Sequence, residues 1–153
     1  MVYNLKTTQR LPITLDKAWS FLSDPKNLAV ITPPELGFKI TCDLPPKMYE
    51  GMMISYTVRP LGPFPMVWVS EITHLNPPHF FVDEQRVGPY SLWHHEHHLT
   101  EIDGGVEMRD LITYKVPGGP LGGIINALMV RPQLNRIFAF REVKLNELFG
   151  AFA

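Results

Sequence analysis

The residues most capable of chemistry form one short run, His94-His95-Glu96-His97-His98, which contains four of the six histidines in the chain. In a β-strand, odd-numbered and even-numbered positions point to opposite faces. The odd-numbered face combines His95 and His97 with the large apolar Trp93, which suits the wall of a ligand cavity. The even-numbered face holds the other two histidines and the glutamate, so it is wholly polar and is expected in solvent.

Strand pairing turns this run into a defined patch. Asp103-Gly104 is a strong signal for a two-residue hairpin loop. A three-residue turn at Gly88–Tyr90 would pair the preceding strand with the histidine strand. This second register is less secure, because a one-residue change in it would turn Asp83 outward. The predicted cross-strand pairs are Leu99–Met108, His97–Asp110, His95–Ile112 and Trp93–Tyr114 on one side, and Gln85–Trp93, Asp83–His95 and Phe81–His97 on the other.

Two histidines thus meet two carboxylates, Asp83 and Asp110, within an apolar ring. A carboxylate beside an imidazole raises its pKa and fixes its tautomer, so His97 with Asp110 could serve as ligand anchor, acid or base. The alternative is a structural pair that holds adjacent strands in register, because buried polar groups are normally paired. His95 and Asp83 are the further catalytic candidates.

A metal site is the competing interpretation of the same run. His-x-His on a strand with a carboxylate is the ligand set of cupins and of facial-triad iron sites. Six residues separate Gly88 from His95, which is too many for the cupin pattern, although Glu101 lies at a fitting distance beyond His97. A terminal helix is also foreign to a jelly roll. The sequence therefore predicts no native metal and no cofactor.

The elements that must position the patch follow in a clear order. A weakly alternating strand at 2–9 precedes a short helix capped by Thr14 or Asp16 and a second short helix after Pro25. Pro60–Pro65 is expected to be a rigid loop. Segments of period 2 then predict about six antiparallel strands, at 38–42, 52–58, 66–74, 79–87, 88–99 and 106–114.

Two further aromatic residues of these strands are candidates for the cavity. Tyr56 could present its hydroxyl to a ligand, and a core tyrosine bonded to backbone is the alternative. Trp68 is in phase with Ser70, so it either contacts the ligand or fills the core.

The last segment, 121–149, returns to helical spacing and provides the apolar cover that the concave face of a sheet requires. Arg131-Pro132 should kink or restart this helix, because proline removes a backbone hydrogen bond. Arg141 lies close to the apolar stripe and could pair with a sheet carboxylate, an anionic ligand head or solvent. The predicted stripe is Ile125, Leu128, Met129, Leu134, Ile137, Phe138, Leu145, Leu148 and Phe149.

The composition is that of one folded domain over residues 1–153, with 45% hydrophobic and 19% charged residues. A formal net charge of −1 without a basic run argues against nucleic acid and anionic membranes as partners. No apolar run is long enough to span a bilayer or resembles a signal peptide. The single cysteine, Cys42, excludes an internal disulfide and fits a reducing compartment, so the cytoplasm is expected.

The chain also carries a series of short motifs: Ser23-Asp24-Pro25, Asn27-Leu28, Thr32-Pro33-Pro34, Trp68 with Glu71-Ile72, Phe81–Gln85, Gly88-Pro89-Tyr90, Trp93-x-His95-x-His97, Asp110 with Tyr114, and Phe140-Arg141. With the element order β-α-α-β6-α, they resemble the START-like or Bet v 1-like (SRPBCC) superfamily, often labelled polyketide cyclase/dehydrase and lipid transport. The resemblance is narrower to a bacterial ligand-binding subfamily and covers nearly the whole chain. It implies an α+β helix-grip fold, in which a curved antiparallel sheet wraps around a long C-terminal helix.

These observations predict binding of a small hydrophobic molecule, of lipid, polyketide or isoprenoid type, between the sheet and the terminal helix. Two alternatives stay open. One is a cofactor-independent cyclase or dehydratase that uses a His–Asp pair, and the other is a ligand-free interaction or regulatory module whose interior is filled by side chains. The predicted ligand-contacting residues are Tyr56, Trp68, Phe81, Asp83, Gln85, Trp93, His95, His97, Met108, Asp110, Tyr114, Phe138 and Arg141.

Overall fold

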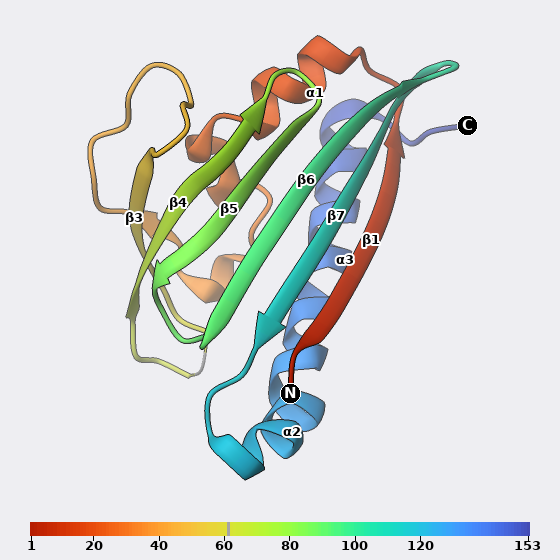
Figure 1. Cartoon of the computed structure of the whole chain (residues 1–153). Helices are drawn as coiled ribbons and strands as arrows, with labels where there is room; N and C mark the ends of the chain where they lie inside the picture. Colours follow the sequence, from red (N-terminus) through yellow and green to blue (C-terminus); the bar gives the residue numbers. More distant parts are fainter. Residues whose placement is uncertain (61) are drawn as a thin grey trace.

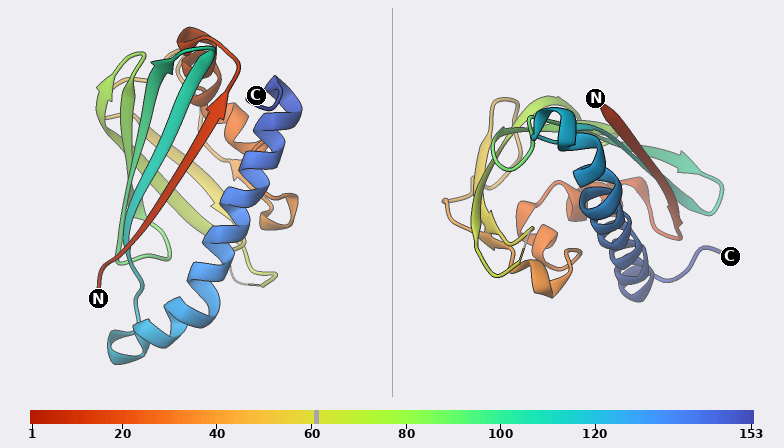
Figure 2. Two further views of the ribbon diagram at one scale, coloured as in Figure 1. Left: turned by 90° about the vertical axis from the view of Figure 1, so that its right-hand side faces the viewer. Right: turned by 90° about the horizontal axis from the view of Figure 1, so that it is seen from below.

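A computed structural model of the chain, which describes residues 1–60 and 62–153, consists of one antiparallel sheet and a long C-terminal helix. Its elements are β1 (Tyr3–Leu11), α1 (Leu15–Leu22), η1 (Pro25–Ala29), η2 (Pro34–Leu36), β2 (Lys39–Ile40), β3 (Met53–Val58), β4 (Met66–Asn76), β5 (Phe80–Val87), β6 (Leu92–Ile102), β7 (Gly105–Lys115), η3 (Gly119–Leu121), α2 (Gly122–Ile125), η4 (Asn126–Val130) and α3 (Arg131–Phe149). The seven strands are ordered β1-β7-β6-β5-β4-β3-β2. The sheet curves around α3, which lies along its concave side (Figures 1 and 2). The predicted α+β architecture is confirmed.

Local sequence explains where the two short N-terminal helices begin. The Thr14 hydroxyl accepts a hydrogen bond from the Lys17 amide at 3.3 Å and so caps α1. Asp24 caps η1 by accepting from the Lys26 amide at 3.0 Å, and Pro25 occupies its first turn. These helices close one side of the space between the sheet and α3 (Figure 2).

The pairing of β6 with β7 matches the predicted register at every position, from Leu99–Met108 to Trp93–Tyr114. Asp103-Gly104 forms the two-residue loop, and Gly104 adopts a φ of +78° that favours glycine. The hairpin signal in the sequence therefore set the register of the whole strand pair.

The pairing of β5 with β6 is confirmed in part. Asp83 lies opposite His95 and Phe81 opposite His97, as predicted, but the ladder ends one position before Gln85. The predicted Gln85–Trp93 pair is wrong. The side-chain amide of Gln85 instead closes the turn. Its Nε2 donates to the backbone carbonyl of Tyr90 at 2.7 Å, and its Oε1 accepts from the backbone N–H of Tyr90 at 3.1 Å.

Irregular pairing between β4 and β5 contributes to the curvature of the sheet. The register shifts between Val69 and Ser70 and again between Ile72 and His74. Such bulges bend a strand and increase its twist. They lie on the strands that wall the cavity described below.

The C-terminal segment is interrupted as predicted. A π-helical stretch, η4, precedes α3, and Pro132 lies in the first turn of α3. The predicted apolar stripe is wrong at three positions, because Leu128, Met129 and Leu148 are exposed. The first two lie on η4, whose buried residues are Asn126 and Val130, so they fall on the solvent side of that stretch. The buried stripe of α3 is Leu134, Phe138, Arg141 and Leu145.

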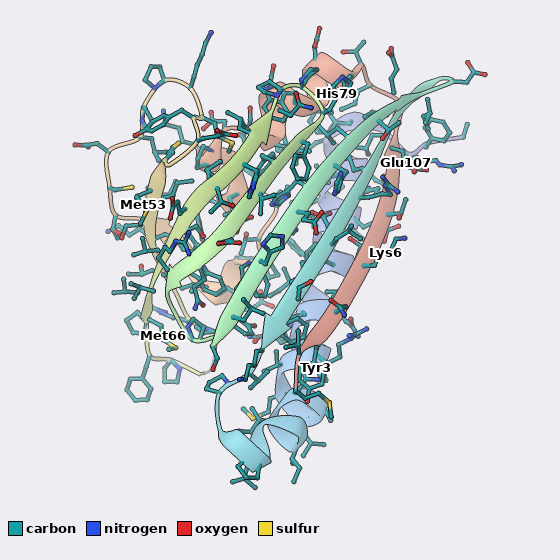
Figure 3. All side chains as sticks on the ribbon, viewed as in Figure 1. Tyr3, Lys6, Met53, Met66, His79 and Glu107 are labelled. Carbon is teal, nitrogen blue, oxygen red and sulfur yellow. The ribbon has the colours of Figure 1, made fainter. Side chains whose placement is uncertain are left out.

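The outer face of the sheet is largely polar. Lys6 and Glu107, which Figure 3 labels, lie on it, and Glu107 accepts a hydrogen bond from Arg10 at 3.0 Å. Leu61, within the Pro60–Pro65 loop predicted to be rigid, lies outside the described residues. In the described part of the chain, no helix is both long and apolar enough to cross a bilayer.

Candidate functional site

A cavity of about 190 Å³ lies between the sheet, α3 and the short helices. This space would hold several water molecules at roughly 30 Å³ each. Its lining is mostly aliphatic and aromatic. Its charged and polar side chains, apart from the aromatic ones, are Asp24, Asn27, Thr32, Ser70, Asp83, His95, His97, Gln133 and Arg141. The filled interior expected of a ligand-free module is not observed. Of the predicted ligand-contacting residues, those that line the cavity are Tyr56, Trp68, Phe81, Asp83, Trp93, His95, His97, Phe138 and Arg141.

Aromatic rings form one wall of the cavity. The ring of Trp68 stacks against Tyr56, with centroids 5.9 Å apart, and meets Trp93 edge-on at 5.3 Å. The Trp68 indole N–H donates to the Ser70 hydroxyl at 3.0 Å, so this ring presents an apolar surface with its polar atom already satisfied. Burial and the nearby Asp83 carboxylate raise the pKa of Tyr56, and its hydroxyl therefore stays protonated.

At the polar end of the cavity, two histidines and two aspartates form a crossed network. His95 Nε2 donates to Asp110 Oδ1 at 2.8 Å, and His97 Nε2 donates to Asp83 Oδ2 at 2.6 Å. The backbone pairs are His97 opposite Asp110 and His95 opposite Asp83, so the shortest contacts run diagonally between strands. The direct contacts are longer, with His97 Nδ1 3.2 Å from Asp110 Oδ1 and His95 Nδ1 3.5 Å from Asp83 Oδ2.

Asp110 lies behind the histidines and does not line the cavity. In addition to the two imidazoles, it accepts hydrogen bonds from Arg141 Nη1 and from the Thr7 hydroxyl, both at 3.4 Å. Thr7 was not among the predicted site residues. Thr7 alternates in phase with Leu5 on the first strand, which could have indicated that it faces inward. Its position opposite Asp110 could not be predicted, because no local turn connects β1 to β7.

The pKa values of the two histidines move in opposite directions. Burial opposes charge on both rings, but hydrogen bonds to Asp110 and Asp83 outweigh it for His97 and raise its pKa. Burial lowers the pKa of His95, and the neighbouring His97, with ring centroids 3.7 Å apart, lowers it further. Despite burial, the histidine contacts hold the pKa of both carboxyls below its usual range, and most strongly for Asp110.

Arg141 belongs to the buried stripe of α3 and also lines the cavity. It is 8% exposed, its guanidinium lies 4.7 Å from the Phe138 ring centroid, and its contact with Asp110 fulfils the predicted pairing with a sheet carboxylate. Within the described part of the chain, its buried Nε finds no hydrogen-bond partner. A buried donor without a partner is costly, so this atom weakens the packing of Arg141 in the structure.

Four predicted ligand-contacting residues lie away from the cavity. Met108 packs in a second core cluster with Leu99 and Leu145, and Tyr114 is fully buried, where its hydroxyl donates to Asn126 Oδ1 at 2.9 Å. Gln85 closes its own turn, and Asp110 supports the histidines from behind. The inward face of a strand is longer than the cavity: α1 and the end of α3 pack around Met108 at one end, and η4 contacts Tyr114 at the other.

The cavity also includes residues that the sequence interpretation did not select. Ile54 and Ser70 were in phase with Tyr56 and Trp68, and that alternation could have identified them. Other cavity residues lie on η1 and next to it. They belong to the motifs that carry the family resemblance, and no role was predicted for them. The η1 region contributes Asp24, Pro25, Asn27 and Leu28.

The arrangement is chemically versatile. Imidazoles paired with carboxylates at the wall of an apolar cavity can anchor a ligand, transfer protons or bind a metal ion. The catalytic interpretation required His97 and Asp110 on the same face of the sheet, and they are. In the described residues, Asp83, His95 and His97 each offer one metal-donor atom within 4.8 Å of the other two.

Comparisons with known proteins show the fold. No protein-family model and no curated protein matches the chain. Solved structures do match. The Zhui aromatase/cyclase from Streptomyces sp. R1128 has a TM-score of 0.69 and 14% identity, over 99% of this chain and 100% of that chain. Ara h 8.0201 has a TM-score of 0.63 and 14% identity, over 96% of this chain and 99% of that chain. Protein Ms6760 from Mycobacterium smegmatis has a TM-score of 0.65 and 19% identity, over 95% of this chain and 92% of that chain. The chain therefore has the same helix-grip fold as these solved structures.

Proposed function

We propose that this chain is a single binding domain for a small hydrophobic molecule with a polar or anionic end, of the lipid, polyketide or isoprenoid kind. The observation that carries the proposal is the cavity of about 190 Å³, with a mostly apolar lining and with His95, His97 and Arg141 gathered around Asp110. Ligand sites commonly combine a mostly apolar lining with a few placed polar groups. The unpaired Cys42 supports a cytoplasmic location.

The aromatic wall would accept the apolar body of the ligand, and the polar end of the cavity would orient it. Arg141, a buried cation that lines the cavity, supports an acceptor oxygen or an anionic group on the ligand. The fold similarity to an aromatase/cyclase supports a cavity of this type and does not identify the bound molecule.

Fluorescence titration with 8-anilinonaphthalene-1-sulfonate (ANS), an aromatic anion, tests this proposal. We expect one saturable site per chain. Ile54→Trp, which fills the cavity from β3, should abolish binding, whereas Met53→Trp, the same change at the neighbouring exposed position, should not. Absence of saturable binding, or equal binding by both variants, would contradict the proposal.

A further inference from the structure

We propose that Asp83, His95 and His97 form a binding site for one divalent transition-metal ion that faces the cavity, with Asp110 orienting both imidazoles from behind. The sequence argued against a metal because the spacing from Gly88 to His95 and the terminal helix do not fit a cupin. The structure supplies the carboxylate from the adjacent strand β5.

The donor atoms already lie close to coordination geometry. In a tetrahedral site, metal–nitrogen and metal–oxygen bonds of about 2.0–2.2 Å place adjacent ligand atoms about 3.3–3.6 Å apart. The Asp83 Oδ2 atom is 3.5 Å from His95 Nδ1, which is within this range, and 2.6 Å from His97 Nε2, which is shorter. The donor atoms of the three residues lie within 4.8 Å of one another, so side-chain movements of about 1 Å would allow all three to bind one ion.

The opposite ring nitrogens point to a second layer of the site. His95 Nε2 and His97 Nδ1 both contact Asp110 Oδ1, at 2.8 and 3.2 Å. A histidine that binds a metal usually donates its other N–H to a carboxylate, which fixes the tautomer and the ring orientation. Asp110 performs this role for both rings at once, and Thr7 and Arg141 hold Asp110 in place.

The position of the site leaves coordination positions open. Asp83, His95 and His97 line the cavity, whereas Asp110 does not. Three protein ligands on one side of an ion leave the other positions for water or for an oxygen of a cavity ligand. Two imidazoles and one carboxylate favour Zn²⁺, Fe²⁺ or Co²⁺ over Mg²⁺ and Ca²⁺, which prefer oxygen ligands.

The outer face of β6 provides a matched control, because it also carries two histidines and a glutamate. Its ion pairs, such as His94 Nδ1 with Glu84 Oε1 at 2.6 Å, are partly open to solvent. Any metal held by a run of surface histidines should depend on His94 and His98. A metal held by the inner triad should not.

Calorimetric titration of the chelator-treated protein with Zn²⁺ alone tests the proposal, independently of whether any hydrophobic molecule binds. We expect one ion per chain, with affinity reduced about 100-fold or more by Asp83→Asn and about 10–100-fold by Asp110→Asn. His94→Ala/His98→Ala should leave stoichiometry and affinity unchanged. No binding by the unmodified protein, or loss of binding in the outer-face variant, would overturn the proposal.

A second measurement does not depend on the folding of any variant. Paramagnetic Co²⁺, added to the unmodified protein at one equivalent, should shift the ring proton signals of His95 and His97 much more strongly than those of His94 and His98, because only rings bound to the ion experience contact shifts. The reverse pattern would assign the metal to the surface run and would overturn the inner site.

Discussion

Strand β6 carries two histidines on each face, and the two pairs have different surroundings. On the inner face, the side chains of His95 and His97 are 6% and 13% exposed and contact Asp83 and Asp110. On the outer face, His94 and His98 are 30% and 27% exposed and contact Glu84 and Glu96. Residue type and ion-pair distance are similar on the two faces.

The comparison shows that burial, and not residue type, determines what such a pair can do. Water screens the outer pairs, so each contributes roughly 0–1 kcal/mol to stability. The inner pairs lie at the wall of a cavity, where removing one partner leaves the other buried without compensation. The same four histidines therefore divide into a partly solvated pair and a buried pair that lines the cavity.

The largest predicted contrast is between Asp110→Ala and Glu96→Ala. Asp110 accepts hydrogen bonds from three side chains and lies 3.2 Å from His97 Nδ1, so its removal should lower the free energy of unfolding by about 3–5 kcal/mol. Glu96→Ala should cost no more than about 1 kcal/mol. Urea unfolding measures both, and equal shifts in the midpoint would remove the distinction between the faces.

A smaller contrast is expected for the histidines themselves. His95→Ala removes the closest donor of Asp110 and should cost about 1–3 kcal/mol. His94→Ala, one position along, should cost about 0–1 kcal/mol. Thermal unfolding of both variants at the same pH measures the two changes in stability. A larger loss of stability for His94→Ala than for His95→Ala would contradict the difference between the two faces.

Tyr114→Phe separates the inner face from the cavity. Tyr114 faces inward but does not line the cavity, and its hydroxyl bonds to Asn126. We expect a loss of stability of about 0.5–1.5 kcal/mol with ANS affinity unchanged. A substantial loss of ANS affinity would show that Tyr114 contributes to ligand binding after all.

The smallest effect is expected for the ion pair between Arg86 and Glu71 on the outer face. Its distance is 2.5 Å, but the two side chains are 45% and 29% exposed. Glu71→Gln should change stability by less than about 1 kcal/mol, and the difference should vanish at high salt. A salt-independent loss larger than that would show that the outer face is less solvated than its exposure indicates.

Much of the fold could be predicted from the sequence because the signals are local. The alternation of β3 to β7 and the Asp103-Gly104 loop were sufficient for the β6–β7 register. Arg131-Pro132 correctly marked the break before α3. These features depend on residues close together in the chain, where period and turn chemistry are readable.

The candidate site could be predicted only in part, because its details depend on contacts between distant segments. The sequence placed the two histidines beside two aspartates but could not show that the shortest contacts are diagonal. It could not foresee the Thr7 contact, since β1 reaches β7 only through the folded sheet. Met108 faces inward as expected, but packing with Leu145 fills that end of the interior.

The most direct test of the central claim, that the inner face of β6 is the polar end of a ligand cavity, is NMR of the four imidazole rings during ANS titration. The signals of His94 and His98 would be assigned with His94→Gln and His98→Gln variants. The account predicts that saturating ANS shifts the ring signals of His95 and His97 and leaves those of His94 and His98 in place. Shifts confined to the outer pair, or no shift in the inner pair at saturation, would contradict it.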